Sequence, residues 1–308
     1  MNDYSKIGSA IVIGDCALLV RISVFDVRTK KNREPSVEYH DLDITNKKQL
    51  DNALRQIRPQ AIIHTASPPP LLTDLSLYLR VNVEGTRTLL QSAQEVGVKA
   101  FVYTSSASVV HDSVSDLVEA DETLPLVYLP VQREYYTNSK ALADQLVLDY
   151  NNSMDGRMLT ACLRPSDVFG EGDGTALAFA ENAASGKYKY QVGNGQNLFD
   201  FAYNGNVAYA HILLLQAPLR SHIKAPEGDM VVGGETFFIT NDEHVSFWDL
   251  LDELGPLQGI PQIQRQQNLF PYSGTHNSRS CGMGGLDHLF GSKEIEDDYF
   301  GDQIQLHD

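Results

Sequence analysis

Cysteine is scarce in this chain, and its placement excludes two kinds of site. Only three cysteines occur in 308 residues, at Cys16, Cys162 and Cys281, and none forms a C-x-x-C pair. Disulfide frameworks and structural zinc sites both need evenly paired or closely spaced ligands. The nine histidines form no H-x-x-x-H pattern either. We therefore predict no metal site and a reducing, intracellular location.

Basic residues and long apolar runs are also few. Lys and Arg number 24 against 40 Asp and Glu, which gives a formal net charge of −16. Such a surface repels phosphate backbones, so nucleic acid is not expected as a partner. No apolar run approaches the roughly 18–20 residues that a bilayer span needs, and the first residues lack the apolar region of a signal peptide. We expect a cytoplasmic protein without a transmembrane segment.

The chain does contain a regular alternation of short apolar runs and helical patterns. In chain order the predicted elements are a strand at 61–67, a helix at 75–97 with Gly97 as its C-cap, a strand at 100–106, a helix at 139–152 and a strand at 159–170. This β-α-β-α-β order predicts an α/β fold, a Rossmann-like doubly wound parallel sheet. In such sheets ligands bind beyond the carboxyl ends of the strands.

The predicted organisation has three parts. Residues 1–170 form a dinucleotide-binding Rossmann core whose first β-α unit is degenerate. Residues 171–261 form a small substrate-binding region, interleaved with the last core elements. Residues 262–308 have little periodicity, several glycines and an acidic end, which predicts a poorly ordered tail.

The first β-α unit lacks its usual helix. Residues 11–27 read as two buried strands, the second ending in Asp26, with five residues between them. A G-x-G-x-x-G loop and a helix usually stand there, with the acid roughly 20 residues further on. Here only Gly14 is present, and parallel neighbours need a crossover of about a dozen residues. The unit is therefore either rebuilt, for example as a short edge strand and turn at 9–20 or under cover of a partner chain, or broken.

The sharpest chemical signal is YYTNSK, in which Tyr136 and Lys140 stand four residues apart at the start of a helix. That spacing places both side chains on one helical face. An ammonium beside a phenol stabilises the phenolate, so the tyrosine can accept a proton near neutral pH. Ser106, at the end of the strand 100–106, could hydrogen-bond the same substrate oxygen, whereas Ser105 points to the opposite face of that strand.

These residues belong to a longer series of strings that resembles a known family. The chain is similar to the extended short-chain dehydrogenases, and within them to the 3β-hydroxysteroid dehydrogenase group, most of all its fungal sterol C-3 dehydrogenase (C-4 decarboxylase) branch. The resemblance covers roughly residues 22–255. The strings that carry it are HTASPP, VNVEGT, GVKAFVYTSSASVV, YxxxK, LRPSDVFGEGD, NVAYAH and FFITNDEHVSFWDL.

The resemblance implies catalytic roles for four residues. Tyr136 would be the general base, Lys140 its electrostatic partner and a ribose contact, and Ser106 a second donor to the reacting oxygen. Asn82 would support a water chain to the lysine, although capping of a helix start explains it equally well. His64 and His211 lie in family-like strings, and we interpret them as core histidines.

The same resemblance implies an NAD site. Asp26 would bind the adenosine ribose and favour NAD over NADP, with Arg28 leaving tolerance of a 2′-phosphate open. The other implied cofactor residues are Gly14 in the remnant of the phosphate loop, Asp43 near the adenine or as a turn acid, Ala66 and Ser67 at the fourth strand end, Lys140 at the ribose, and Pro165 near the nicotinamide.

The resulting hypothesis is an NAD(P)-dependent oxidoreductase that oxidises a secondary 3β-type alcohol on a sterol, triterpenoid or related polycyclic compound, with C-4 decarboxylation where a carboxylate is present. The partner is then a small hydrophobic alcohol or ketone. The family also suggests a homodimer and association with the surface of the endoplasmic reticulum. Because the phosphate loop is missing, we expect weakened cofactor binding. The alternative is a cofactor-independent isomerase or cyclase, or an inactive descendant.

Overall fold

The structure is a computed structural model of the chain. The residues described are 10–14, 21–30, 33–70, 72–151, 158–170, 182, 185, 190–192, 195–222, 231–250, 252 and 266–268, of which 10–14, 190–192 and 266–268 are described by backbone alone. The chain divides into two compact units, which are Met1–Pro165 with Ala210–Phe238, and Ser166–Tyr209 with Ile239–Asp308. The predicted tail 262–308 lies outside the described residues except for 266–268.

The first unit is built on a seven-stranded sheet with the order β10-β6-β5-β4-β1-β2-β3. Its strands are β1 (Ala10–Gly14), β2 (Arg21–Asp26), β3 (Val37–Asp41), β4 (Ala61–His64), β5 (Ala100–Thr104), β6 (Leu159–Pro165) and β10 (Thr236–Ile239). Strands β2 to β6 run in one direction, because β2 pairs with β3, β4 with β5 and β5 with β6 in parallel, while β1 is antiparallel to both β2 and β4. The α/β sheet predicted from the sequence is thus confirmed.

Strand β1 answers the question of the missing helix. It occupies the position between β2 and β4, but it runs against them, with Gly14 opposite Arg21 and Ala10 opposite His64. A short connection can join antiparallel neighbours, whereas a parallel pair needs a long crossover. The unit is therefore rebuilt as a strand and a short connection, as the sequence allowed, but the strand lies inside the sheet and not at its edge.

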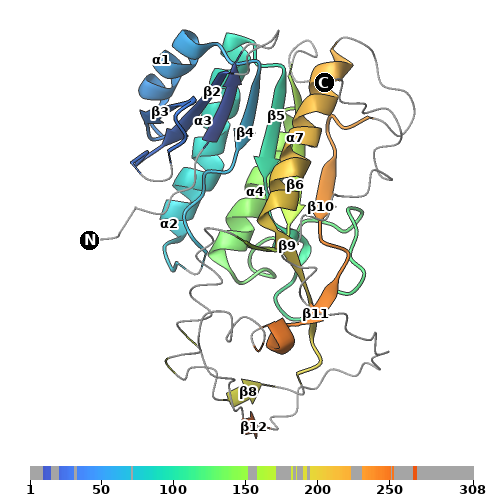
Figure 1. Ribbon diagram of the computed structural model, residues 1–308. Coiled ribbons are helices and arrows are strands. Elements are labelled where there is room, and N and C mark those ends of the chain that lie inside the picture. The colour runs from blue at the N-terminus through green and yellow to red at the C-terminus, as the bar shows by residue number, and fades with distance from the viewer. Residues whose placement is uncertain are drawn as a thin grey trace. The chain divides into compact units, whose positions relative to one another are not determined.

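One face of this sheet is covered by helices whose apolar sides meet in a common core (Figure 1). The helices are α1 (Lys47–Ile57), α2 (Leu75–Tyr78), the π-helical segment η1 (Leu79–Gly85), α3 (Thr86–Val96) and α4 (Tyr135–Asp149). Leu50 and Leu54 of α1 and Leu89 and Leu90 of α3 are fully buried, and each such side chain contributes about 1.5–3 kcal/mol on leaving water. Gly97 ends α3 at φ 83°, as the sequence predicted, because this left-handed conformation strains a residue with a Cβ atom.

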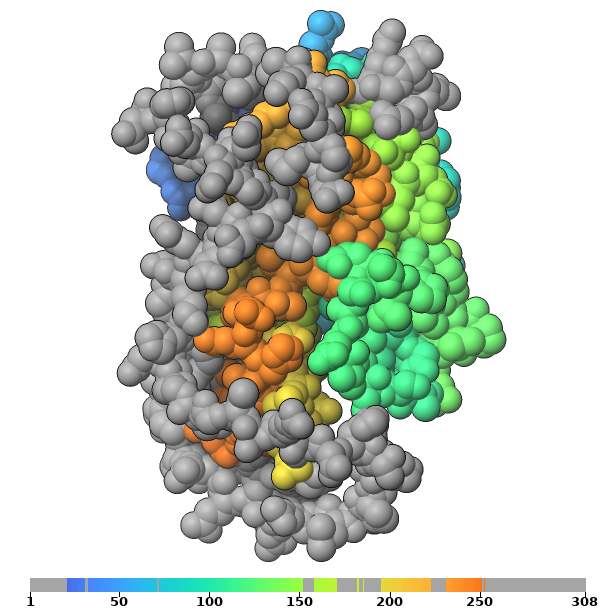
Figure 2. Space-filling model, turned by 90° about the vertical axis from the view of Figure 1, so that its right-hand side faces the viewer, coloured from blue at the N-terminus to red at the C-terminus, as the bar shows by residue number. Residues whose placement is uncertain are grey.

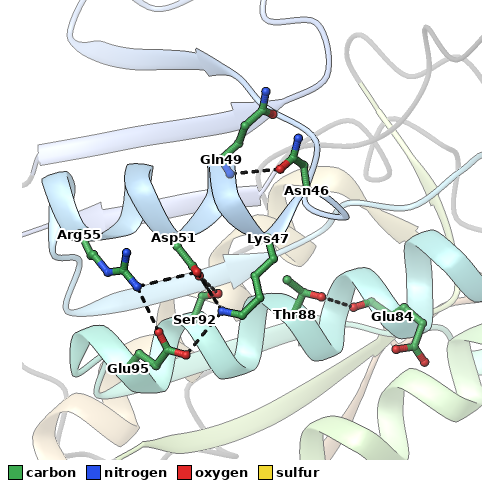
Figure 3. Close-up of polar contacts among 9 residues, drawn as sticks. All are labelled: Asn46, Lys47, Gln49, Asp51, Arg55, Glu84, Thr88, Ser92 and Glu95. Carbon is green, nitrogen blue, oxygen red and sulfur yellow. Dashed lines mark hydrogen bonds and ion pairs between the residues drawn. The ribbon is translucent and has the colours of Figure 1, made fainter.

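Outside this core, α1 and α3 are joined by a polar cluster (Figure 3). The Asp51 carboxylate accepts hydrogen bonds from Ser92 Oγ at 2.5 Å and Lys47 Nζ at 2.9 Å. Glu95 lies 3.5 Å from both Lys47 Nζ and Arg55 Nη2. These contacts hold the two helices in register, with the Ser92 hydrogen bond being the largest cause that lowers the pKa of Asp51.

The opposite face carries α7 (Asn204–Ser221), drawn in front of the sheet in Figure 1. Its His211 Nε2 lies 2.7 Å from Thr104 Oγ1 at the end of β5. The predicted core role of His211 agrees with its burial.

The second unit has small sheets of its own. Strands β7 (Asp167–Phe169), β9 (Leu198–Tyr203) and β11 (His244–Ser246) form one sheet, and β8 (Tyr190–Val192) pairs with β12 (Gln266–Asn268). Phe169, Phe201 and Leu250 form its buried apolar cluster. The first unit also contains a short 3-10 turn, η2 (Ala107–Val110), after Ser106.

Candidate active site

The first two turns of α4 carry Tyr136 and Lys140, one turn apart on the same face of the helix. The extended backbone of Glu134 precedes the helix, and Lys140 is only 2% exposed. Its Nζ atom donates to the Thr104 carbonyl oxygen at 2.7 Å and lies 5.8 Å from the centre of the Tyr136 ring. Burial lowers the pKa of Lys140 to about 7, because a desolvated ammonium is costly. The helix thus places a buried amine beside the phenol, as the four-residue spacing predicted.

Ser106 is tied to the same helix through hydroxyl groups. It follows β5 and is half-buried, with its Oγ atom 2.8 Å from Ser108 Oγ. Ser108 Oγ lies 3.2 Å from Thr137 Oγ1, which belongs to the residue after Tyr136. Ser105 is buried at 3% exposure. These hydroxyl contacts connect the carboxyl end of β5 to the start of α4. Ser106 and Tyr136 therefore both lie at the carboxyl ends of the strands.

Asn82 lies inside a continuous helical stretch. It belongs to η1, whereas Asp74 is the residue that caps the start at α2. The interpretation of Asn82 as a helix-start cap is therefore wrong. Its side chain is fully buried, and its Nδ2 atom donates to Ser139 Oγ at 2.9 Å. Ser139 in turn donates to the Tyr136 carbonyl oxygen at 2.7 Å, so Asn82 braces the turn that carries the tyrosine.

A hollow at the carboxyl ends of β2 and β4 brings together three of the predicted cofactor residues, Asp26, Asp43 and Ala66. Its remaining walls are apolar, from Phe25, Val27, Leu42, Ile44 and Val81. The carboxylate of Asp26 accepts the backbone N–H of Arg28 at 2.8 Å. Asp43 also has the turn role left open by the sequence, because its carboxylate accepts the N–H and Oγ1–H of Thr45, both at 2.8 Å. The hollow thus combines apolar walls with two carboxylates.

The remaining predicted cofactor residues fall in different places. Ser67 is half-buried after β4 and donates to the Pro68 carbonyl oxygen at 2.9 Å, and Pro165 is the last residue of β6. Gly14 is the exception. Because β1 is antiparallel, Gly14 lies beside Arg21, the first residue of β2. Asp26 is the last residue of β2, so the two lie at opposite ends of that strand. The expectation that Gly14 belongs to a phosphate loop at the cofactor edge is therefore wrong.

Two residues under the site were missed by the sequence reasoning. Asp144, one turn after Lys140, forms a bidentate ion pair with Arg164 of β6, with distances of 2.9 and 3.0 Å. The two side chains are 0% and 3% exposed. The i, i+4 spacing of Lys140 and Asp144 was a readable signal, because it places both on one face of α4. The Asp144 carboxylate opposes the effect of burial on the pKa of Lys140.

The segment between η2 and α4 forms the green lobe at the right of Figure 2. It exposes an unusual number of apolar side chains directly before the helix that carries Tyr136. They are Val114, Leu117, Val118, Leu124, Leu129 and Val131. Exposed apolar surface concentrated in one place is typical of contact with an apolar ligand or partner.

Among the described residues, no group of His, Cys, Asp and Glu side chains could hold a metal ion. None of the helices described has the length and apolarity for a membrane crossing.

With this geometry in view, the comparisons with known proteins identify the family. The model of the 3-beta hydroxysteroid dehydrogenase/isomerase family matches residues 7–268. The chain therefore belongs to this family, as its motifs suggested. It is 40% identical over 240 residues to a decarboxylating sterol-4-alpha-carboxylate 3-dehydrogenase of Candida albicans. The matched region covers 75% of this chain and 65% of that protein. It is 35% identical over 266 residues to the Mus musculus protein of that name, covering 82% and 69%.

Solved structures show the same fold. The UDP-glucose 4-epimerase of Thermus thermophilus, in complex with NAD, superposes with a TM-score of 0.62 at 23% identity, covering 80% of this chain and 78% of that chain. The UDP-glucose 4-epimerase of Thermotoga maritima, with UDP-glucose, gives a TM-score of 0.62 at 17% identity, covering 80% and 77%. At these identities the likeness concerns the Rossmann-like architecture.

Proposed function

We propose that this chain is an NAD-dependent oxidoreductase that oxidises a secondary 3β-type alcohol on a sterol or a related polycyclic compound. The family and the names of its relatives support the reaction class. The observation that carries the proposal is the joining of Ser106, Tyr136 and Lys140 at the edge of the sheet where the Asp26 hollow also opens. NAD in place of NADP is favoured by the Asp26 carboxylate, which would repel a 2′-phosphate.

The reaction would use these side chains as follows. Tyr136 must be a phenolate before the reaction, and the Lys140 ammonium stabilises that charge. The phenolate oxygen then accepts the proton of the substrate hydroxyl. Ser106 Oγ donates a hydrogen bond to the oxygen as it becomes a carbonyl. The nicotinamide, when bound, supplies the hydride acceptor. A carboxylate β to the new ketone can leave as CO₂ without further protein groups.

The cofactor fits this chain at its two ends better than in its middle. The Asp26 hollow suits the adenosine, and Lys140 suits the ribose next to the reacting ring. The pyrophosphate normally lies on glycine N–H groups and a helix N-terminus, but β1 turns its carboxyl end, with Gly14, to the other edge. If hydrogen bonds and helix dipole together contribute about 3 kcal/mol, their loss weakens binding by about 10²-fold.

The apolar lobe before α4 supports a hydrophobic substrate, because it offers apolar surface close in sequence to Tyr136. A homodimer and a location at the endoplasmic reticulum surface rest on the family alone and stay predictions.

Titration of the purified chain with NADH, followed by fluorescence, and turnover of a 3β-hydroxysterol carrying a 4-carboxyl group test the proposal. We expect binding that weakens at least tenfold in Asp26→Ala, and turnover that falls about 10²–10⁴-fold in Tyr136→Phe, the range for loss of a general base. Tyr135→Phe, the neighbouring tyrosine, is the matched control and should retain activity. Absence of both NADH binding and turnover would contradict the proposal.

A second candidate follows from the reversed direction of β1. A cofactor-independent isomerase would need the tyrosine as acid and base but no phosphate loop. Turnover without nicotinamide that disappears in Tyr136→Phe would favour it over the dehydrogenase.

A further inference from the structure

A continuous chain of buried hydrogen bonds runs from β4 to the helix that carries Tyr136. His64 Nε2 lies 2.8 Å from Thr86 Oγ1, and Thr86 Oγ1 lies 2.5 Å from the Asn82 carbonyl oxygen. Asn82 Nδ2 then reaches Ser139 Oγ, which reaches the Tyr136 carbonyl oxygen. His64, Thr86, Asn82 and Ser139 are each 0% exposed.

The direction of every hydrogen bond in this chain is fixed by its two carbonyl oxygens, because a carbonyl can only accept. Thr86 must donate to the Asn82 carbonyl, so its Oγ1 atom accepts from His64. The imidazole therefore carries its proton on Nε2, and Nδ1 is a bare acceptor. By the same logic Ser139 donates to the Tyr136 carbonyl and accepts from Asn82 Nδ2. The Asn82 Oδ1 atom is then a second bare acceptor.

Both bare acceptors are buried and, within the described residues, have no hydrogen-bond partner. The same is true of the Tyr103 hydroxyl. Buried polar atoms in native proteins nearly always have a partner, often an ordered water molecule. His64 also stays uncharged, because burial and the charge of Lys140 lower its pKa to about 3. A neutral imidazole with a bare Nδ1 calls for a donor.

The donors lie around the same aromatic ring. The Tyr103 ring centre is 5.3 Å from the His64 ring centre and 5.0 Å from Lys140 Nζ. Lys140 uses one N–H on the Thr104 carbonyl, and an ammonium has three. A water molecule between His64 and Lys140 would accept from the ammonium and donate to Nδ1, which supplies the donor that the imidazole lacks.

We propose that His64 is a positioning residue that holds, through Nδ1, a buried water molecule shared with the Lys140 ammonium. The water site does not depend on the proposed function, whereas its effect on catalysis does. A water that accepts from Lys140 and donates to a neutral acceptor stabilises the charged amine without adding a second charge.

The charge of Lys140 depends on everything that faces it. These groups are Tyr136 and Asp144 from its own helix, Tyr103 from β5, Cys162 from β6 and His64 from β4. Of these, Cys162 and Tyr103 are buried groups whose pKa values are raised, so they stay neutral. Asp144 is already paired with Arg164. His64 is thus the neutral acceptor through which the water can favour the ammonium.

Two measurements on the full wild-type chain test the site without requiring activity. The ¹⁵N spectrum of labelled histidine should show His64 protonated at Nε2 and not at Nδ1, with the signal assigned by its loss in His64→Gln. A crystal structure should show a water molecule within hydrogen-bond distance of His64 Nδ1 and of Lys140 Nζ or Tyr103 Oη. An Nδ1-protonated imidazole, or no such water in well-defined density, would overturn the proposal.

If the chain turns over substrate, the catalytic part is tested by the pH profile of kcat/KM. Loss of the acceptor disfavours the ammonium and lowers the pKa of Lys140, so the high-pH limb should move to lower pH in His64→Leu. His64→Gln, which retains an acceptor oxygen, should keep that limb closer to wild type. If the high-pH limb moved equally in both variants, or did not move in either, His64 would act on the fold alone. Absence of wild-type turnover would contradict the proposed function, while the two structural readouts would still decide the water site.

Discussion

The Nζ atom of Lys140 lies 2.7 Å from the carbonyl oxygen of Thr104, the last residue of β5. This contact ties the helix that carries the proposed base to the strand that leads into Ser106. The hydroxyl of the same threonine lies 2.7 Å from His211 Nε2 on the other face of the sheet. Thr104 therefore links side chains from both faces at the point where the site is built.

The burial of Lys140 predicts an unusual pH dependence of stability. Its pKa is about 7 in the folded protein against 10.5 for an exposed lysine. Between these values the unfolded chain binds one more proton, so stability rises with pH, by up to about 1.4 kcal/mol per pH unit. Urea unfolding at several pH values between 7 and 10 should show this slope in wild type and its loss in Lys140→Met. Parallel curves for the two proteins would show that the amine is not desolvated.

The Asp144–Arg164 pair predicts a large penalty for removing one partner. Arg164→Met leaves the fully buried carboxylate of Asp144 without its counter-ion, which should cost about 3–5 kcal/mol of unfolding free energy. The double variant Asp144→Leu with Arg164→Met removes both charges and should recover most of that loss. Denaturant unfolding of the three proteins measures both effects. A double variant no more stable than the single one would contradict the electrostatic explanation.

The polar cluster between α1 and α3 predicts resistance to mild acid. Hydrogen bonding to Ser92 lowers the pKa of Asp51, so its contribution is present above the ordinary carboxyl pKa near 4 and is lost as pH falls below it. Ser92→Ala should cost about 1 kcal/mol at pH 7 and less as Asp51 becomes protonated, because a neutral carboxyl is a weaker acceptor.

Thr88→Ala is the matched control, because Thr88 Oγ1 donates to the Glu84 carbonyl oxygen of the preceding segment η1 and does not contact Asp51 (Figure 3). Its effect should not change with pH. Thermal unfolding at pH 7 and pH 3 distinguishes the two variants, and a Ser92→Ala loss of equal size at both pH values would refute the assigned cause.

Much of the fold could be predicted because the hydrophobic pattern and the residues that end helices and strands agree. The strands that begin at Ala61 and Ala100, and the cap at Gly97, were readable from apolar runs and a glycine. Their predicted ends, at residues 67 and 106, were too late, because the strands end at His64 and Thr104. The direction of β1 was not, because an apolar run of five residues has no polarity that distinguishes parallel from antiparallel pairing. The short connection after Gly14 was the only signal, and it pointed to a rebuilt unit without saying where the strand would lie.

Part of the candidate site could likewise be predicted from the sequence. Tyr136 and Lys140 stand at a spacing that a helix converts into proximity, whereas Asn82 depended on a π-helical segment that sequence patterns do not reveal. Arg164 and Asp144 are twenty residues apart in sequence and meet only because α4 packs on β6.

The cap of α3 gives a simple test of backbone geometry. Gly97 has φ 83°, and an added Cβ would meet no atom within 4 Å, so any cost of substitution is conformational. Gly97→Ala should destabilise the protein by about 1–2 kcal/mol, and Gly97→Asn by less, because asparagine tolerates this conformation. Equal losses in the two variants, measured by urea unfolding, would argue against a backbone cause.

The reversed strand also acts as a spacer. Neighbouring strands lie about 4.8 Å apart, so with β1 between them β2 and β4 are held about 9.6 Å apart, the separation that a complete Rossmann core would give them. Had the segment been deleted outright, β2 would pair with β4 directly, and Asp26 and Ala66 would close on each other. The reversed strand therefore preserves the spacing between Asp26 and Ala66, although it places Gly14 at the far end of β2.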